Sequence, residues 1–315
     1  MAKIKLFDPH SISKREALID IVFTLLFLLL QGTFVGINGN HIFVIVLFNV
    51  LYFAHPMLRK LAVALLPFAV FGMSYDWMRI YPNYKVNPID IQELYETEKA
   101  LFGIATEGGT LIPGEYFNLH NSAVADFFAG IFYLCWVPGP MAFGLWLFFK
   151  GERKWYLRFA LAFLFVNIVG FIGYYIHPAA PPWYAINYGF EPDFSTPGNT
   201  AGLDRFDNLI GFPIFASIYV NNSNIFAAIP SLHAAYMLIT TIYAVKCRQP
   251  KPLIAVCAII TLGIWWTAVY SCHHYIIDVL LGILTAVVGV GLFEVFLMRL
   301  TFFKRFIQSY TKYIS

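Results

Sequence analysis

IPSLHAAY at residues 229–236 and YSCHHYIID at residues 270–278 decide the fold of this chain. Each stretch is a polar, histidine-bearing end of a long apolar run, and the apolar runs 229–247 and 252–271 connect the two. A helix crosses a bilayer core with about 20 mostly apolar residues. Two successive crossings return the chain to the face it left. The sequence therefore predicts that both histidine clusters meet at one membrane face.

The composition of the whole chain also indicates a membrane solvent. Of 315 residues, 59% are hydrophobic and only 12% are charged, and the mean hydropathy is +0.66. Soluble domains carry about 25% charged residues. The net charge of +3 is too small to indicate a nucleic-acid partner. The four cysteines show neither a CxxC pair nor the spacing of a disulfide framework.

The apolar runs predict an all-α, polytopic membrane bundle of about eight transmembrane helices. The first run follows a polar N-terminal segment, which favours a retained helix over a cleavable signal peptide. The second run is short and ends at His55-Pro56, so a re-entrant segment is the alternative there. The predicted spans are residues 17–37, 41–57, 60–80, 123–149, 155–176, 229–247, 252–271 and 274–299.

The basic residues orient these spans. With the N-terminus inside and eight crossings, only four of the 21 Lys and Arg residues fall outside, namely Arg79, Lys85, Lys99 and Arg205, which leaves 21 − 4 = 17 inside. The positive-inside rule predicts this asymmetry. The histidine clusters are then expected on the extracytoplasmic face, on the periplasmic side of a bacterial inner membrane or in the Golgi lumen of a eukaryote. The compact size and short tails favour the bacterial membrane.

This topology divides the chain into a peripheral part, a core and a tail. The outer loops of the core are expected to differ, because residues 91–102 carry a partial apolar stripe whereas the second loop is irregular and rich in Pro, Gly and Asn. The stripe is typical either of a helix in the membrane interface or of a helix that caps the bundle. The predicted regions are residues 1–58 with two peripheral transmembrane helices, residues 59–300 as a six-helix catalytic core with outer loops 81–122 and 177–228, and residues 301–315 as a cytoplasmic tail.

His274 and Asp278 stand four residues apart at the start of the last predicted span. At this spacing two side chains share one helix face, with Cβ atoms about 5–6 Å apart. An ionisable group within an apolar helix usually faces the bundle interior with a partner. A carboxylate bonded to one imidazole nitrogen leaves the other available as a nucleophile or base. The pair is a candidate catalytic site, and the alternative is a contact that only secures the helix end.

His233 follows Pro230 and Ser231 at the entrance of the sixth predicted span. Proline and serine are common helix-capping residues, which is the structural alternative for Ser231. The start of a helix also binds anions through its free N–H groups, so Ser231 is a candidate for substrate binding. A histidine in this first turn could supply the proton that a leaving alkoxide needs.

Arg205 is the only Lys or Arg within the loop 177–228. A guanidinium holds phosphate oxygens through paired hydrogen bonds, although a salt bridge with Asp204 or Asp207 would also explain a lone arginine. Asp126, at the outer start of the fourth span, is assigned either to an ion-pair scaffold or to a substrate contact. Zinc is the rival chemistry for HHxxxD, but no HExxH or Asp-rich cluster accompanies it. No metal and no cofactor are expected.

The histidine blocks also carry a family resemblance. PSLHA at 230–234 and HHYIID at 273–278 resemble the second and third motifs of the type 2 phosphatidic acid phosphatase superfamily. Together with APPWY at 180–184 and GLDRFD at 202–207, they are similar to the inositol phosphorylceramide synthases, which include the fungal target of aureobasidin A, and to their bacterial relatives. The resemblance covers roughly residues 60–300. The phosphatases' Lys-x6-Arg-Pro motif is absent here, which favours the synthase branch.

The resemblance implies transfer of phosphoinositol through a phosphohistidine. His274 attacks the phosphorus of phosphatidylinositol while Asp278 orients its ring. His233 protonates the departing diacylglycerol and then deprotonates the primary hydroxyl of a (dihydro)ceramide. Arg205 and His273, with the helix start at Ser231, are expected to hold the phosphoryl oxygens. The remaining expected substrate contacts are Asp126, Trp183, Tyr184 and Asp207.

Two other functions fit part of the sequence. A lipid phosphate phosphatase of the same fold would resolve the intermediate with water, and the catalytic residues alone do not separate it from a synthase. A transporter or scaffold is disfavoured because no file of charges runs through the bilayer centre. The expected partners are the bilayer, phosphatidylinositol and a ceramide-type lipid. An accessory subunit or a homo-oligomer is left open.

Overall fold

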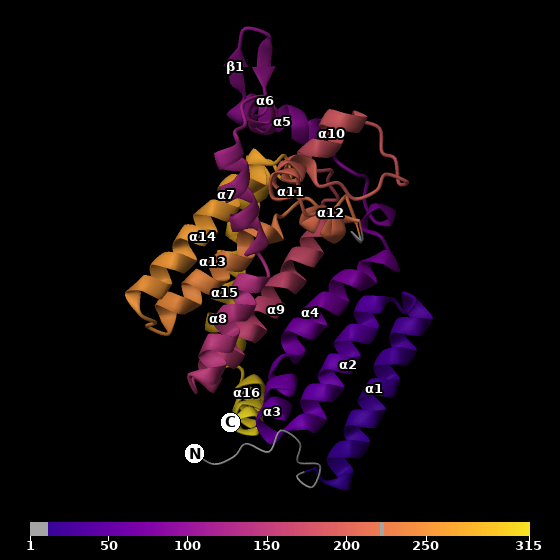
Figure 1. Ribbon diagram of the computed structural model, residues 1–315, viewed down its shortest axis with the longest axis vertical. Helices are drawn as coiled ribbons and strands as arrows, with labels where there is room; N and C mark the ends of the chain where they lie inside the picture. Colours follow the sequence, from indigo (N-terminus) through magenta and orange to yellow (C-terminus); the bar gives the residue numbers. More distant parts are fainter. Residues whose placement is uncertain (1–11, 221–223) are drawn as a thin grey trace.

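The computed structural model describes residues 12–220 and 224–315, and its long apolar helices run along the long axis of the molecule (Figure 1). Short helices and one hairpin cover one end of this bundle, and the C-terminus lies at the other. The long elements are α1 (Lys14–Phe34), α2 (Gly39–Ala54), α3 (Pro56–Ala64), α4 (Leu66–Asp76), α7 (Ala123–Leu134), α8 (Pro138–Phe149), α9 (Arg153–Ile176), α13 (Leu232–Lys246), α14 (Lys251–Tyr270) and α15 (Ile276–Gly291).

All eight predicted apolar runs are helical, but not all are long enough to cross a bilayer. Among the described residues, four helices meet the length and composition of a span: α1, α9, α14 and the segment that continues α15 to Arg299. Counting the bent pairs α3–α4 and α7–α8 as one span each raises the number to six. Helices α2 and α13 have 16 and 15 residues, fewer than the about 20 that a bilayer core requires. The all-α membrane bundle is therefore confirmed, with four to six full-length spans.

Proline accounts for the two bent spans. Their halves meet at angles of 41° for α3–α4 and 47° for α7–α8. Pro67 lies in the first turn of α4, and Pro138 begins α8. Proline has no N–H to donate and its ring clashes with the preceding turn, so it is tolerated at a helix start and interrupts a continuous helix. Each break divides one apolar run into two shorter helices.

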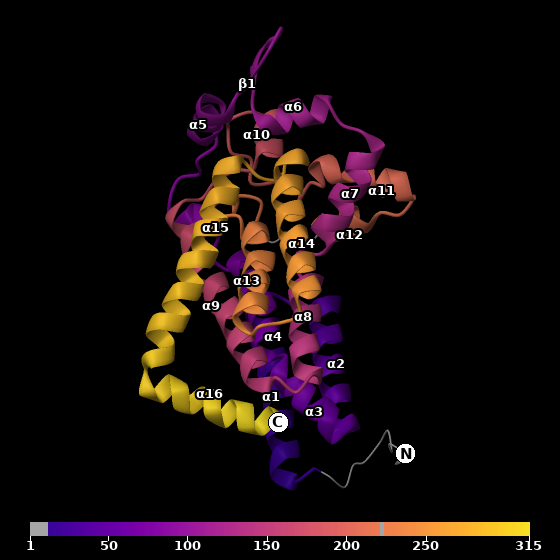
Figure 2. The same ribbon diagram turned by 90° about the vertical axis from the view of Figure 1, so that its left-hand side faces the viewer.

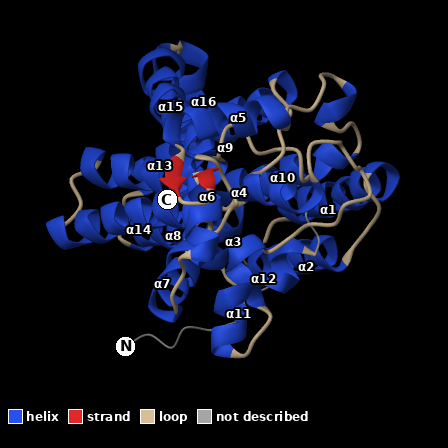
Figure 3. Ribbon diagram, turned by 90° about the horizontal axis from the view of Figure 1, so that it is seen from above, coloured by secondary structure: helices blue, strands red, loops and turns tan. Residues whose placement is uncertain are grey.

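Helix α9 lies at the centre of the bundle. Seen from the capped end, it lies between α14 on one side and α1 on the other (Figure 3). Its aromatic side chains Phe159 and Phe163 are buried in the core. The buried amide of Asn167 accepts a hydrogen bond from the Tyr236 hydroxyl at 2.6 Å, which ties α9 to α13.

Gly282 sets the distance between α13 and α15. A Cβ atom at this position would lie 2.1 Å from the carbonyl oxygen of Ser231, so a larger residue does not fit. The Ser231 amide also donates to the carbonyl of Asp278 at 3.0 Å. The start of α13 and the first turn of α15 are thereby held against each other, which brings the two histidine-bearing stretches together.

The two predicted outer loops form the cap. The chain between α9 and α13 was expected to be irregular, but it contains three short helices. In the first loop, Leu94 and Glu98 are only 4% and 1% exposed, so the striped helix caps the bundle. Strands β1 and β2 form an antiparallel hairpin that projects beyond it (Figure 1). The cap elements are η3 (Asn83–Lys85), α5 (Gln92–Phe102), β1 (Ile104–Thr106), β2 (Gly109–Leu111), α6 (Pro113–Leu119), α10 (Pro182–Tyr188), η4 (Ala201–Leu203), α11 (Asp204–Ile210) and α12 (Ile214–Tyr219).

The C-terminal segment is a helix that crosses the base of the bundle. Helix α16 (Thr301–Ile314) turns sharply away from the end of α15 (Figure 2). Its side chains Ile307 and Ile314 are buried, and Tyr310 donates its hydroxyl proton to the carbonyl of Val63 at 2.5 Å. Its exposed face carries Lys304, Arg305 and Lys312 between aromatic residues. This pattern is typical of a helix at a membrane surface.

Candidate active site

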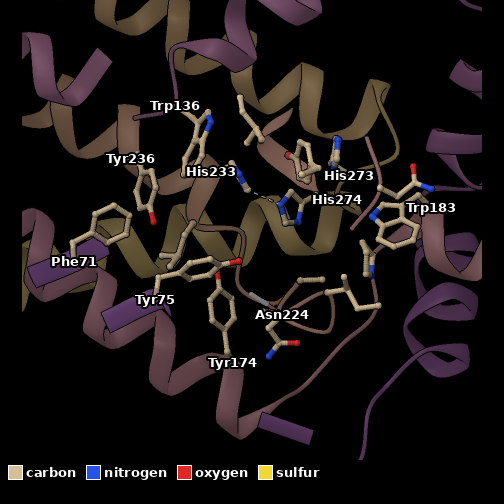
Figure 4. Close-up of a pocket in the computed structure, with 18 residues that line it drawn as sticks. Phe71, Tyr75, Trp136, Tyr174, Trp183, Asn224, His233, Tyr236, His273 and His274 are labelled. Atoms are coloured by element: carbon tan, nitrogen blue, oxygen red, sulfur yellow. Dashed lines mark hydrogen bonds between the residues drawn. The ribbon is translucent and has the colours of Figure 1, made fainter. Parts of the chain in front are cut away.

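A cavity of about 190 Å³ lies where the cap meets the bundle. His233, His273 and His274 line it, and Figure 4 shows His233 and His274 pointing toward each other, with Tyr75 and Tyr174 on the opposite wall. Among the described residues that line the cavity, none is Lys, Arg, Asp or Glu. Any charge on a substrate in this space is therefore met by imidazole rings, hydroxyls, amides and backbone groups.

Three side chains form a continuous hydrogen-bonded row beside the cavity. His233 Nδ1 lies 3.1 Å from His274 Nε2, and His274 Nδ1 lies 3.2 Å from Oδ2 of the fully buried Asp278. The Tyr275 amide donates to the same Oδ2 at 3.0 Å, so this oxygen acts as an acceptor. The proton of His274 is then on Nδ1, and its Nε2 lone pair faces His233 and the cavity. This is the tautomer that a nucleophilic histidine needs.

Ser231 has a structural position at the start of α13. Its side-chain oxygen accepts the Ala234 amide at 3.3 Å, which makes Ser231 the N-cap of the helix. The residue is fully buried and does not line the cavity. The geometry therefore favours the capping alternative over the predicted substrate contact. By setting the start of α13, Ser231 orients His233 two residues later.

His273 lines the cavity but is held by the cap. Its Nε2 lies 2.8 Å from the carbonyl oxygen of Thr200, and its ring stacks between Tyr219 and Tyr133 with centroid distances of 4.6 and 5.4 Å. Burial, with His274 and His233 nearby, lowers the pKa of His273 well below its usual value. A carbonyl only accepts, so the neutral ring carries its proton on Nε2 and its Nδ1 is an acceptor. An acceptor does not hold a phosphoryl oxygen, so the expected oxygen-binding role gains no support from the geometry.

Arg205 lies outside the cavity lining, in a polar cluster between the cap and α7. Its Nε donates to Asp126 Oδ1 at 2.7 Å and its Nη1 to Asn118 Oδ1 at 3.0 Å. The Tyr270 hydroxyl donates to the same Asp126 oxygen at 2.7 Å. Of the alternatives weighed for Asp126, the structure shows the ion-pair scaffold, and the partner of Arg205 is Asp126 and not its neighbour Asp207. Asp207 accepts the amides of two residues in α12 and caps that helix.

The sequence that contains the two histidines and the aspartate matches a known protein family. The family model described as PAP2 superfamily matches residues 113–292, which include His233, His274 and Asp278. The chain belongs to the PAP2 superfamily. The phosphoinositol dihydroceramide synthase of Bacteroides thetaiotaomicron is 60% identical over 96% of this chain and 99% of its own length.

Fungal inositol phosphorylceramide synthases are more distant relatives. The inositol phosphorylceramide synthase catalytic subunit AUR1 of Saccharomyces cerevisiae is 28% identical over 69% of this chain and 52% of its own length. The inositol phosphorylceramide synthase of Candida albicans is 30% identical over 59% of this chain and 40% of its own length. No solved structure matches the chain significantly.

The APPWY segment contributes Pro181 and Trp183 to the lining of the cavity of this PAP2 protein. Trp183 lines the cavity, and its amide donates to the carbonyl of Cys272, the residue before His273, at 3.1 Å. Tyr184 lies behind it, fully buried, where its hydroxyl donates to the carbonyl of Glu191 at 3.0 Å. The two neighbours thus differ in position, and of these two only Trp183 reaches the space where a substrate would lie.

Several lining residues were not predicted from the sequence. Tyr75 and Tyr174 are part of apolar runs, where a tyrosine carries no signal of a polar site, and Asn199 lies in the long outer loop. Tyr75 also lies outside the residues matched by the PAP2 model. Within the described residues, no group of three or more His, Cys, Asp and Glu side chains is arranged to hold a metal ion.

Proposed function

We propose that this PAP2 protein transfers phosphoinositol from an inositol phospholipid to the primary hydroxyl of a ceramide-type lipid, with His274 as the nucleophile. The observation that carries the proposal is the row from His233 through His274 to Asp278 at the edge of a cavity. The 60% identical bacterial relative bears the name of a synthase of this kind. The fungal relatives also bear synthase names, which favours this function over the phosphatase alternative.

In the first half-reaction, Nε2 of His274 forms a bond to phosphorus and the bond from phosphorus to the diacylglycerol oxygen breaks. The anionic phosphodiester favours the protonated form of His233, which gives its proton to the departing oxygen. Asp278 accepts the Nδ1 proton of His274 in a hydrogen bond and stabilises the positive charge on the phosphorylated ring. The products are free diacylglycerol and a phosphohistidine in which phosphorus is bonded to Nε2 of His274 and keeps its ester bond to inositol.

In the second half-reaction, the ceramide hydroxyl gives its proton to His233 and its oxygen attacks phosphorus. The bond between phosphorus and Nε2 breaks, and the electron pair returns to His274. Tyr75 and Tyr174 line the wall that faces the histidines, whereas Arg205 is engaged by Asp126, so the substrate in this cavity meets tyrosine side chains and not a guanidinium (Figure 4). The aromatic wall of Phe71, Trp136 and Tyr236 supports a lipid acceptor over water.

The location of this chemistry is also part of the proposal. The histidine row lies at the capped end of the bundle, whereas the basic residues of α16 lie at the opposite end. The predicted topology places all but four of the 21 Lys and Arg residues on the side opposite the histidines, which supports an extracytoplasmic active site. We assign catalysis to residues 59–300 and a peripheral role to residues 1–58.

The test is a transfer assay with the purified full-length protein in proteoliposomes that contain phosphatidylinositol. Adding a fluorescent short-chain ceramide is expected to yield labelled inositol phosphorylceramide and diacylglycerol, both in the presence and in the absence of EDTA. Release of inositol phosphate without labelled sphingolipid would instead establish a hydrolase that resolves the intermediate with water. Loss of turnover in EDTA with rescue by one divalent ion would contradict the histidine mechanism.

A further inference from the structure

Helix α5 of the cap places a buried carboxylate on the start of α15. Glu98 is 1% exposed. Its Oε1 accepts the amide of Ile276 at 2.8 Å, and its Oε2 accepts the amide of Ile277 at 3.2 Å. Both donors belong to the first turn of α15, where amides have no partner within the helix. Glu98 therefore caps this helix from 178 residues earlier in the sequence.

The capped turn is the one that carries the catalytic pair. His274 Nδ1 and the Tyr275 amide donate to Asp278 Oδ2, and the next two amides donate to Glu98. Oδ1 of Asp278 has no hydrogen-bond partner among the residues that the structure describes. Asp278 is thus oriented through one oxygen only, and its placement depends on where α15 begins.

We propose that Glu98 is a positioning residue for the nucleophile: its two oxygens hold the first turn of α15 so that Asp278 stays aligned with His274 Nδ1. The inference rests on the proposed function, in which His274 attacks phosphorus. Glu98 contacts neither substrate nor the reacting atoms and acts through Ile276, Ile277 and the helix they begin.

A buried carboxylate is unfavourable unless its hydrogen bonds compensate for lost hydration. Burial raises the pKa of Glu98 to about 7, whereas the two backbone hydrogen bonds from α15 act in the opposite direction. Glutamine has nearly the same shape but offers one acceptor oxygen, and its NH2 group would face a second amide N–H. Glu98→Gln therefore separates a role in accepting two hydrogen bonds from a role in packing.

Glu115 provides a matched control within the same cap. Its two oxygens accept the Tyr95 hydroxyl at 2.8 Å and the Ile112 amide at 3.0 Å, and it caps α6 in place of α15. Glu98→Gln and Glu115→Gln thus make the same chemical change in two carboxylate caps. Only the first touches the helix that carries Asp278.

The experiment measures kcat, KM for both lipids, and the single-turnover rate of phosphoenzyme formation, each per folded protein in proteoliposomes. Glu98→Gln is expected to lower kcat and the phosphorylation rate by about 10- to 100-fold with KM nearly unchanged, because one buried amide loses its acceptor. Glu115→Gln is expected to keep the wild-type kcat within about two-fold. Glu98→Asp, which withdraws both oxygens by one methylene, should also be slow.

Three results would overturn the assignment: a wild-type kcat in Glu98→Gln, a raised KM with unchanged kcat, or failure of both Glu98 variants to fold while Glu115→Gln folds. The last result would make Glu98 a folding residue only. His274→Ala distinguishes the two proposals. Activity in His274→Ala refutes the phosphohistidine mechanism, whereas an inactive His274→Ala beside a fully active Glu98→Gln refutes only the role of Glu98.

Discussion

His274 and His233 share one contact of 3.1 Å, yet the proposed mechanism gives them different tasks. His274→Ala removes the nucleophile, so neither product nor phosphoenzyme is expected. His233→Ala removes the proton donor and should stop turnover of lipid substrates. It should still be labelled by a substrate with an activated phenol leaving group, since a phenolate departs without a proton. The measurement is trapping of an acid-labile, base-stable phosphoenzyme. Labelling of His274→Ala but not of His273→Ala would move the nucleophile by one residue.

Asp278 orients His274 and does not react itself. Asp278→Asn keeps the size of the side chain, and its amide oxygen can still accept from the Tyr275 amide and from His274 Nδ1, but it carries no negative charge to stabilise the positive charge on the phosphorylated ring. We expect the phosphorylation rate to fall by about 10²–10⁴-fold, by analogy with the carboxylate of a catalytic triad. Rapid-quench measurement of phosphoenzyme formation tests this. A wild-type rate in Asp278→Asn would show that the His–Asp contact only secures the helix end.

At the scale of elements, the site depends on how closely α13 approaches α15. Gly282→Ala places a methyl group where the Ser231 carbonyl lies, so the helices must separate and His233 must move from His274. We expect a loss of about 1–3 kcal/mol in stability, together with a large loss of activity. Gly291→Ala in the same helix is the control, because a Cβ there meets nothing within 4 Å. Thermal unfolding and the transfer assay report the two effects. If Gly282→Ala and Gly291→Ala showed the same stability and the same activity, the close approach of α13 and α15 at Gly282 would not be what the site requires.

At the scale of the whole molecule, the proposal puts the cap and the opposite end of the bundle, where α16 and its basic residues lie, on different sides of the membrane. Lys154 and Ser195 are both exposed, one at the start of α9 and one in the long outer loop. In a background without the native cysteines, S195C is expected to react with an impermeant thiol reagent in intact cells, whereas K154C is expected to react only after the membrane is opened. Labelling of both positions from one side would contradict the topology, whereas the histidine chemistry would be unaffected.

Rules that act locally along the chain were sufficient for the long apolar helices and for one half of the site, but not for the short helices of the second outer loop. Hydropathy identified every apolar run. A helix in lipid satisfies its backbone hydrogen bonds within itself, so its stability there depends mainly on its own residues. The i and i+4 spacing of His274 and Asp278 follows from helix geometry, and the structure shows their side chains 3.2 Å apart. The two predicted crossings between His233 and His274 also placed both histidines at the same end of the bundle.

Contacts between distant segments decided the other half of the site. Arg205 pairs with Asp126, His273 donates to Thr200, and Glu98 caps α15 from another loop. Each of these polar groups had several candidate partners along the chain. Which partner it meets depends on how the cap folds over the bundle, because hydrogen bonds and ion pairs act over a few ångströms and carry no periodic pattern in the sequence. Only the packing of the outer loops selects one partner from the set.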